Sequence, residues 1–183
     1  MIMTDRRDLL TAMAALPILP AGQNAEGAAP VEPTPVAAGQ FDWLSGDWRI
    51  AHRRLKAPGD WDVFEGEATC WSILDGRAQV EELRIPARDF AGMGLRSLDP
   101  AAGVWLDYWM NGKVGLIGGD GVPGRFIAGE GVFDSGDSDD QGPMIVRGLW
   151  DQITGQSHRW RQGVSRDGGT TWDWNWIMDW TKA

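Results

Sequence analysis

Cysteine, histidine and tyrosine are nearly absent from this 183-residue chain, which has one cysteine, two histidines and one tyrosine. The single Cys70 excludes an internal disulfide and a thiolate zinc site. His52 and His158 leave little material for a histidine-rich metal site. Basic residues are also scarce, because 17 Lys and Arg stand against 26 Asp and Glu, a net charge of −9. This balance argues against nucleic acid as a partner, since nucleic-acid binders present a basic surface.

Common catalytic and cofactor motifs are missing too. The glycines at 118, 119 and 121 are followed by neither a lysine nor a helical pattern, so they do not form a phosphate-binding loop. No Gly-x-Ser-x-Gly nucleophile elbow occurs, and the two histidines stand far apart in the sequence. The sequence therefore assigns no catalytic residue and predicts neither a metal nor another cofactor.

The first 40 residues differ from the rest, because they are rich in alanine and proline and contain no aromatic residue. Arg6-Arg7-Asp8-Leu9-Leu10 resembles a bacterial twin-arginine export signal, and the apolar stretch after it is too short to span a bilayer. We interpret 1–25 as the signal segment, 26–40 as a Pro/Ala-rich linker and 41–183 as the folded domain. This predicts a periplasmic or exported protein without a stable membrane span, or a cytoplasmic one if the segment is not a signal.

From residue 46 onward, apolar and polar residues alternate with a period of two, as in β-strands. Turn-forming pairs such as Asp75-Gly76 and Asp167-Gly168 separate the segments at short intervals. Many short strands with regular turns predict an all-β fold, an antiparallel up-and-down barrel of about eight to ten strands. A single helical turn over 41–44 is expected before the first strand.

The alternation also predicts which side chains face the interior, if the more apolar face of each strand points inward. By that rule Glu67 shares the inner face with Trp61 and Trp71, and Tyr108 shares it with its apolar neighbours. The rule leaves both faces open for Glu82 and Arg84. In the last segment it places five apolar residues on one inner row: Trp172, Trp174, Trp176, Met178 and Trp180.

Two short motifs stand at the two ends of the domain. Gly46-Asp47-Trp48 resembles the glycine-any-tryptophan motif that opens calycin-type barrels such as lipocalins and fatty-acid-binding proteins. Residues 165–172, Ser-Arg-Asp-Gly-Gly-Thr-Thr-Trp, fit the aspartate-box pattern, which is typical of a capped β-turn. One copy in so short a domain indicates a stable hairpin and not a sialidase propeller.

With Leu98-Asp99-Pro100 and the segment 150–154, these motifs make residues 41–183 similar to a bacterial calycin-like family of unestablished function. The resemblance implies a barrel and no particular reaction. We therefore expect a barrel that binds a small apolar or aromatic molecule in its interior. The oligomeric state stays open.

The candidate ligand-binding residues are the aromatic and polar side chains expected to line that interior. They are Trp48, His52, Glu67, Glu82, Arg84, Tyr108, His158, Trp160, Trp174 and Trp176.

Three alternative functions remain. An isomerase, lyase or hydrolase would use a carboxylate with His52 or Tyr108 as acid and base. A nitrobindin-like haem protein would use His52 or His158 as the axial ligand. A carbohydrate binder would cluster Trp43, Trp105 and Trp109 on one outer face.

Overall fold

The computed structural model describes residues 32–183. The expected signal segment 1–25 and residues 26–31 of the expected linker lie outside the described residues. A short 3-10 helix, η1 (Asp42–Leu44), precedes the first strand, which confirms the predicted single turn. A second one, η2 (Pro86–Arg88), lies between β3 and β4. The strands are β1 (Gly46–Ala57), β2 (Asp60–Ile73), β3 (Ala78–Ile85), β4 (Phe90–Asp99), β5 (Val104–Asn111), β6 (Val122–Ile127), β7 (Glu130–Asp139), β8 (Gly142–Asp151), β9 (Ser157–Ser165) and β10 (Asp173–Lys182).

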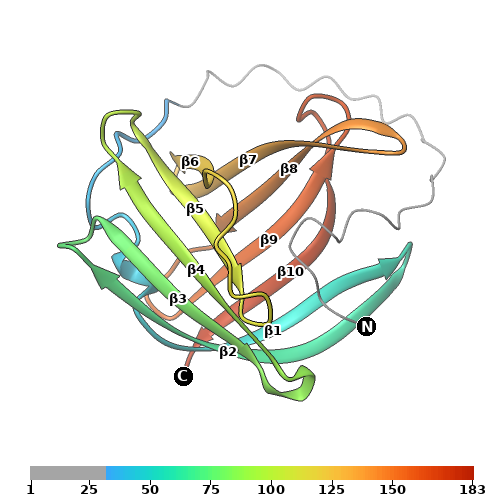
Figure 1. Cartoon of the computed structure of the whole chain (residues 1–183), viewed down its shortest axis with the longest axis horizontal. Coiled ribbons are helices and arrows are strands. Elements are labelled where there is room, and N and C mark those ends of the chain that lie inside the picture. The colour runs from blue at the N-terminus through green and yellow to red at the C-terminus, as the bar shows by residue number, and fades with distance from the viewer. Residues whose placement is uncertain (1–31) are drawn as a thin grey trace.

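These ten strands form one closed antiparallel barrel (Figure 1). Each strand pairs with its neighbours in sequence, and β1 pairs with β10 to close the ring. The predicted all-β, antiparallel up-and-down barrel is therefore confirmed, and this architecture is consistent with the calycin-like resemblance. The weakest seam lies between β5 and β6, where only residues 105–107 pair with 122–124. Among the described residues, no helix has the length and apolar character needed to cross a membrane.

The interior is filled by alternate residues of every strand, as the period of two requires. On β1 the inward residues are Trp48, Ile50 and His52, and on β9 they include His158 and Trp160. The apolar-face rule is wrong for β2, whose inner face carries Phe64 and Ala68 while Trp61 and Trp71 are exposed. It is also wrong for β5, where Trp105 and Asp107 are buried and Tyr108 lies on the outer face.

The predicted single row of tryptophans on β10 is wrong at its first two positions. The pairing of β10 with β9 shifts between Trp174, which lies opposite Gly163, and Trp176, which lies opposite Gln162. This β-bulge inserts Asn175 as an extra residue and reverses which face the alternate residues occupy. As a result Trp176, Met178 and Trp180 are buried in the interior, whereas Trp172 and Trp174 stack on each other outside it.

One end of the barrel is closed by the chain that leads into β1. Thr34 N donates a hydrogen bond to Phe126 O, and Gln40 Oε1 accepts one from Trp105 Nε1 at 2.9 Å. Phe41, which is only 1% exposed, inserts between Trp105 and Phe126, with ring centroids 5.0 and 5.1 Å away. Residues 33–40 thus contact the barrel although they belong to the segment expected as a linker.

The glycine-any-tryptophan motif lies beside this closed end. Gly46 has a φ of +120°, a conformation that favours glycine, and Trp48 Nε1 donates a hydrogen bond to Leu44 O at 2.7 Å. Lys182, near the end of β10, donates from Nζ to Ser45 O and lies 4.1 Å from the centroid of the Trp48 ring. The first and last strands are therefore joined by side-chain contacts as well as by backbone pairing.

Candidate functional site

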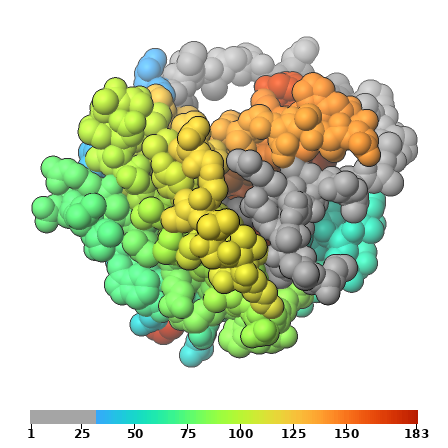
Figure 2. Space-filling view, in the orientation of Figure 1, coloured from blue at the N-terminus to red at the C-terminus, as the bar shows by residue number. Residues whose placement is uncertain are grey.

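A cavity of about 440 Å³ lies inside the barrel, on the side where β5 and β6 barely pair. Its described lining comes from β5, the loop 112–121, and the inner faces of β7, β8 and β9. Figure 2 shows the loop (yellow) and the end of the β7–β8 hairpin (orange) on the same face of the molecule. This volume is within the range of small-molecule pockets.

Aromatic rings form much of the cavity wall. Trp109 from β5, Phe133 from β7 and Trp160 from β9 all line it. Phe133 also packs against Phe41, with ring centroids 6.2 Å apart, so it separates the cavity from the plug at the closed end. Trp160 is held from behind by Trp176 in an edge-to-face contact at 5.9 Å. The walls are thus positioned by rings of the packed core.

Polar side chains lie on the same inner faces. Asp107 and Asn111 come from β5, Ser135 and Asp137 from β7, and Gln162 from β9. Gln162 is 4% exposed and donates a hydrogen bond to Asn175, the bulge residue of β10, while Asn111 accepts one from Lys113 N. Polar groups with fixed positions in an aromatic cavity can orient a ligand through hydrogen bonds.

Asp107 belongs to a buried charged cluster behind the cavity wall. Arg96 of β4 is fully buried and forms ion pairs with Glu81 at 2.6 Å and with Asp107 at 3.2 Å. Its Nη1 also donates to Gln79 Oε1 at 2.8 Å. Burial alone would lower the pKa of Arg96, but Glu81 and Asp107 outweigh it and raise that pKa. The two carboxylates and one guanidinium leave the cluster with a net formal charge of −1.

The two histidines are buried away from the described cavity lining. His52 stacks on Phe64 at 4.5 Å, and its Nδ1 accepts a hydrogen bond from Trp176 Nε1. His158 lies among indoles at the closed end, 4.4 Å from Trp48 and 4.9 Å from Trp180. Burial, with a smaller effect of Arg88 on His52 and of Arg96 and Lys182 on His158, lowers the pKa of each to about 3.

The structure divides the ten predicted site residues between the two faces of the barrel. Five point into the interior: Trp48, His52, His158, Trp160 and Trp176. Five lie outside it: Glu67, Glu82, Arg84, Tyr108 and Trp174. Of all ten, only Trp160 and Tyr108 line the cavity, and the ring of Tyr108 reaches its rim beneath Gly121. The expected inward direction of Glu67, Tyr108 and Trp174 is therefore wrong.

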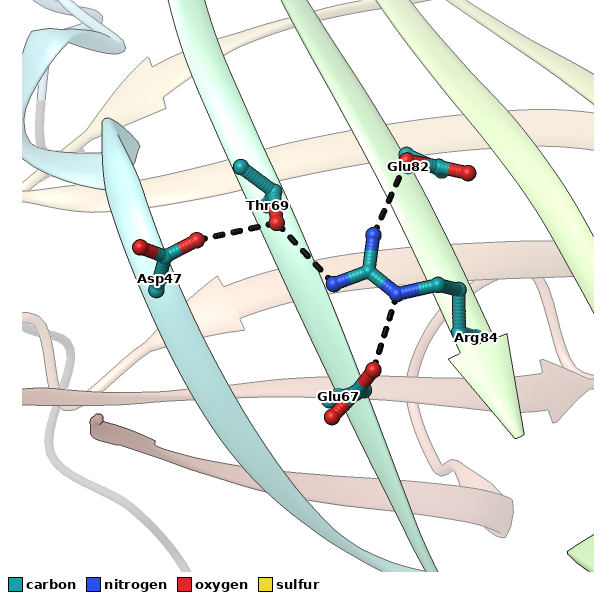
Figure 3. A network of polar contacts seen from close by, with 5 residues as sticks. All are labelled: Asp47, Glu67, Thr69, Glu82 and Arg84. Carbon is teal, nitrogen blue, oxygen red and sulfur yellow. Dashed lines mark hydrogen bonds and ion pairs between the residues drawn. The ribbon is translucent and has the colours of Figure 1, made fainter. Parts of the chain in front are cut away.

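Glu67, Glu82 and Arg84 do meet, but on the outer surface (Figure 3). The Arg84 guanidinium donates to Glu67 Oε1, Glu82 Oε2 and Thr69 Oγ1, each at 2.9 Å, and Thr69 donates to Asp47. The hydrogen bond to Glu67 is the main cause that raises the pKa of Arg84. Both glutamate side chains are about half exposed, so this is a cross-strand surface network of small energetic weight.

Sequence reasoning missed most of the polar cavity lining. Asp107 and Asn111 alternate with apolar residues on β5, and the rule assigned the apolar neighbours of Asp107 to the interior. Gln162 shares the inner face of β9 with Trp160 and was not named as a ligand-binding residue. Glu81 was missed because the pattern left both faces of its strand open, and no inner face was predicted for the strand of Arg96. A usable signal was the run of small residues before Arg96, since Gly92 and Gly94 leave inner space that a long side chain can occupy.

The structure brings together only part of the residue sets that the alternative functions require. For acid-base chemistry by a carboxylate with His52 or Tyr108, His52 does not line the cavity, whereas Tyr108 lines it together with Asp107 and Asp137. Neither histidine faces the cavity as an axial haem ligand would. The outer cluster of tryptophans that a carbohydrate binder would require does not form, because Trp105 is fully buried, Trp43 packs against the core and Trp109 lines the cavity.

A scan against protein-family models finds no match for this chain, and no curated protein compared with it is similar. The site is therefore interpreted from its own geometry.

Proposed function

We propose that this protein binds a small molecule with an aromatic or apolar body inside its barrel. The observation that carries the proposal is the cavity of about 440 Å³, which is walled by Trp109, Phe133 and Trp160 and contains fixed polar groups. The packed core holds these walls in place, so binding requires little ordering of the protein. The calycin-like resemblance supports the same proposal, because such barrels enclose one small ligand.

The test uses N-phenylnaphthylamine, an uncharged dye whose fluorescence increases in apolar surroundings. We expect a saturable increase with the wild-type protein. Val146→Trp should abolish it, because Val146 lines the cavity and an indole there would occupy the ligand volume. A non-saturable signal, or one that is equal in wild type and variant, would contradict the proposal.

The matched control is Ile145→Trp, which adds a tryptophan to the same strand at the adjacent position. Ile145 alternates with the inward residues of β8 and faces the outer side. The Ile145→Trp variant should therefore keep the wild-type dye signal. Thermal unfolding of both tryptophan variants checks that each is folded.

We also propose that the protein is exported through its twin-arginine-like segment, on the basis of Arg6-Arg7 followed by Leu9-Leu10. Replacing both arginines by lysine should retain the chain in the cytoplasm of a bacterial host, as measured by cell fractionation. The control Arg53→Lys lies on β1 and should leave the distribution unchanged. An equal distribution of the double variant and the wild type would refute export by this route.

A further inference from the structure

The charged side chains that line the cavity, among the described residues, all have one sign. The described residues that line it include Asp107 and Asp137, and none of them is Lys, Arg or His. Asp137 is partly buried on the inner face of β7, and its Oδ1 accepts a hydrogen bond from Ser138 N. A bound molecule therefore meets two carboxylates of the lining, one from β5 and one from β7.

The nearest buried cation does not neutralise this field. Arg96 is shared between Asp107 and Glu81, and its guanidinium is fully buried behind the wall. Arg96, Glu81, Asp107 and Asp137 together carry a net formal charge of −2. Other basic side chains also lie near these strands. Lys113 pairs with Asp89, and Arg147 pairs with Asp134 on the outer face. Arg125 of β6 alternates with the inward residues Gly124 and Phe126 and does not line the cavity.

The aromatic walls act in the same direction as the carboxylates. The faces of Trp109, Phe133 and Trp160 carry negative quadrupole potential, which attracts an organic cation and repels an anion. Charges interact more strongly in a partly enclosed cavity than in open water. An ammonium group with an aromatic body would place its charge near a carboxylate and its ring against these walls.

From this arrangement we infer that the cavity selects organic cations, and specifically aromatic molecules that carry an amine. The inference rests on the proposed function and adds the charge of the ligand to it. A neutral aromatic molecule would use the walls alone, and an aromatic carboxylate would meet both aspartates.

The test is isothermal titration calorimetry with three probes that share one ring system: naphthylmethylamine, naphthylmethanol and naphthoate. We expect the amine to bind about tenfold more tightly than the alcohol, and the carboxylate to bind most weakly. The preference for the amine should decrease at high salt because ions screen the carboxylates.

Asp137→Asn removes one cavity charge and keeps an oxygen that can accept from Ser138 N. It should reduce the preference of the amine over the alcohol several-fold, whereas the control Asp134→Asn changes the same charge on the outer face of β7 and should leave the preference unchanged. Equal binding of all three probes, or preference for the carboxylate, would overturn the inference and leave the proposed function standing. Absence of binding by every probe, together with an unsaturable dye signal, would overturn both.

Discussion

His158 shows how a polar side chain can serve as core material. Its ring is 3% exposed and is surrounded by Trp43, Trp48, Trp150 and Trp180, at ring-centroid distances of 4.9, 4.4, 5.5 and 4.9 Å. Within residues 32–183 neither ring nitrogen has a hydrogen-bond partner. An imidazole in this position is held in its neutral form, because a charged ring would lack both water and an opposite charge.

This placement predicts a pH dependence of stability. Both histidines have a folded-state pKa of about 3, whereas the unfolded chain takes up their protons near pH 6.5. Between pH 6.5 and pH 3 the unfolded state therefore binds more protons, and the free energy of unfolding falls as the pH falls. Each histidine should account for about 2 kcal/mol of loss between pH 8 and pH 5, as measured by urea unfolding.

His158→Phe isolates one of these contributions, because phenylalanine keeps a ring among the indoles and cannot take up a proton. The variant should lose about half as much stability as the wild type over this pH interval. Identical pH profiles for the two proteins would contradict the assignment. Asp167, whose pKa is lowered to about 2 mainly by hydrogen bonds from Thr171, loses its stabilising effect only below about pH 4 and does not interfere.

At the scale of elements, the period of two predicted the strands and the barrel but gave the wrong inner face on β2 and β5. On β2 the outer face carries Trp61 and Trp71, and the inner face carries Gly66 and Ala68. Small inner residues are needed where a neighbouring ring fills the space, since a Cβ on Gly66 would lie 2.6 Å from His52 Nε2. This demand comes from partners distant in sequence, so hydrophobicity along one strand cannot reveal it.

The two end motifs were more informative because their contacts are local. The turn 165–172 forms as predicted: Asp167 accepts from Thr171 N at 2.9 Å, Ser165 Oγ accepts from Gly169 N at 2.8 Å, and Gly168 and Gly169 have φ values of +72° and +92°. The bulge that follows at Asn175 has no comparable local signal. The bulge turns Trp174 to the outer face, and Arg161 stabilises it there, because its guanidinium lies 4.0 Å from the centroid of the Trp174 ring.

The candidate site could be predicted only in its general character. An aromatic interior with convergent polar groups was expected, and Trp160 was among the residues named for it. Asp107, Asn111 and Gln162 could not be identified, because their place in the cavity depends on the closed register of β5, β7, β8 and β9. The predicted polar group of Glu67, Glu82 and Arg84 is real as a cluster but faces the solvent side.

At the scale of the whole molecule, the barrel has one end closed by its own chain and a cavity on the far side of Phe133. The closed end is built from residues 33–44, which contact β6 and β5 through Thr34 and Gln40. Phe41 is the central residue of this plug, since its ring meets Trp105, Phe126, Phe133 and Trp150. The segment that leads into β1 thus completes a core drawn from β5 to β8.

Phe41→Ala tests whether this plug is part of the cooperative fold. Removing a fully buried aromatic ring leaves a cavity, and we expect the free energy of unfolding to fall by about 3 to 5 kcal/mol in urea. Phe41→Leu keeps most of the volume and should cost less. Because Phe133 separates the plug from the ligand cavity, both variants should retain dye binding under conditions where they are folded. A loss below about 1 kcal/mol for the alanine variant would show that the end segment packs on the barrel without stabilising it.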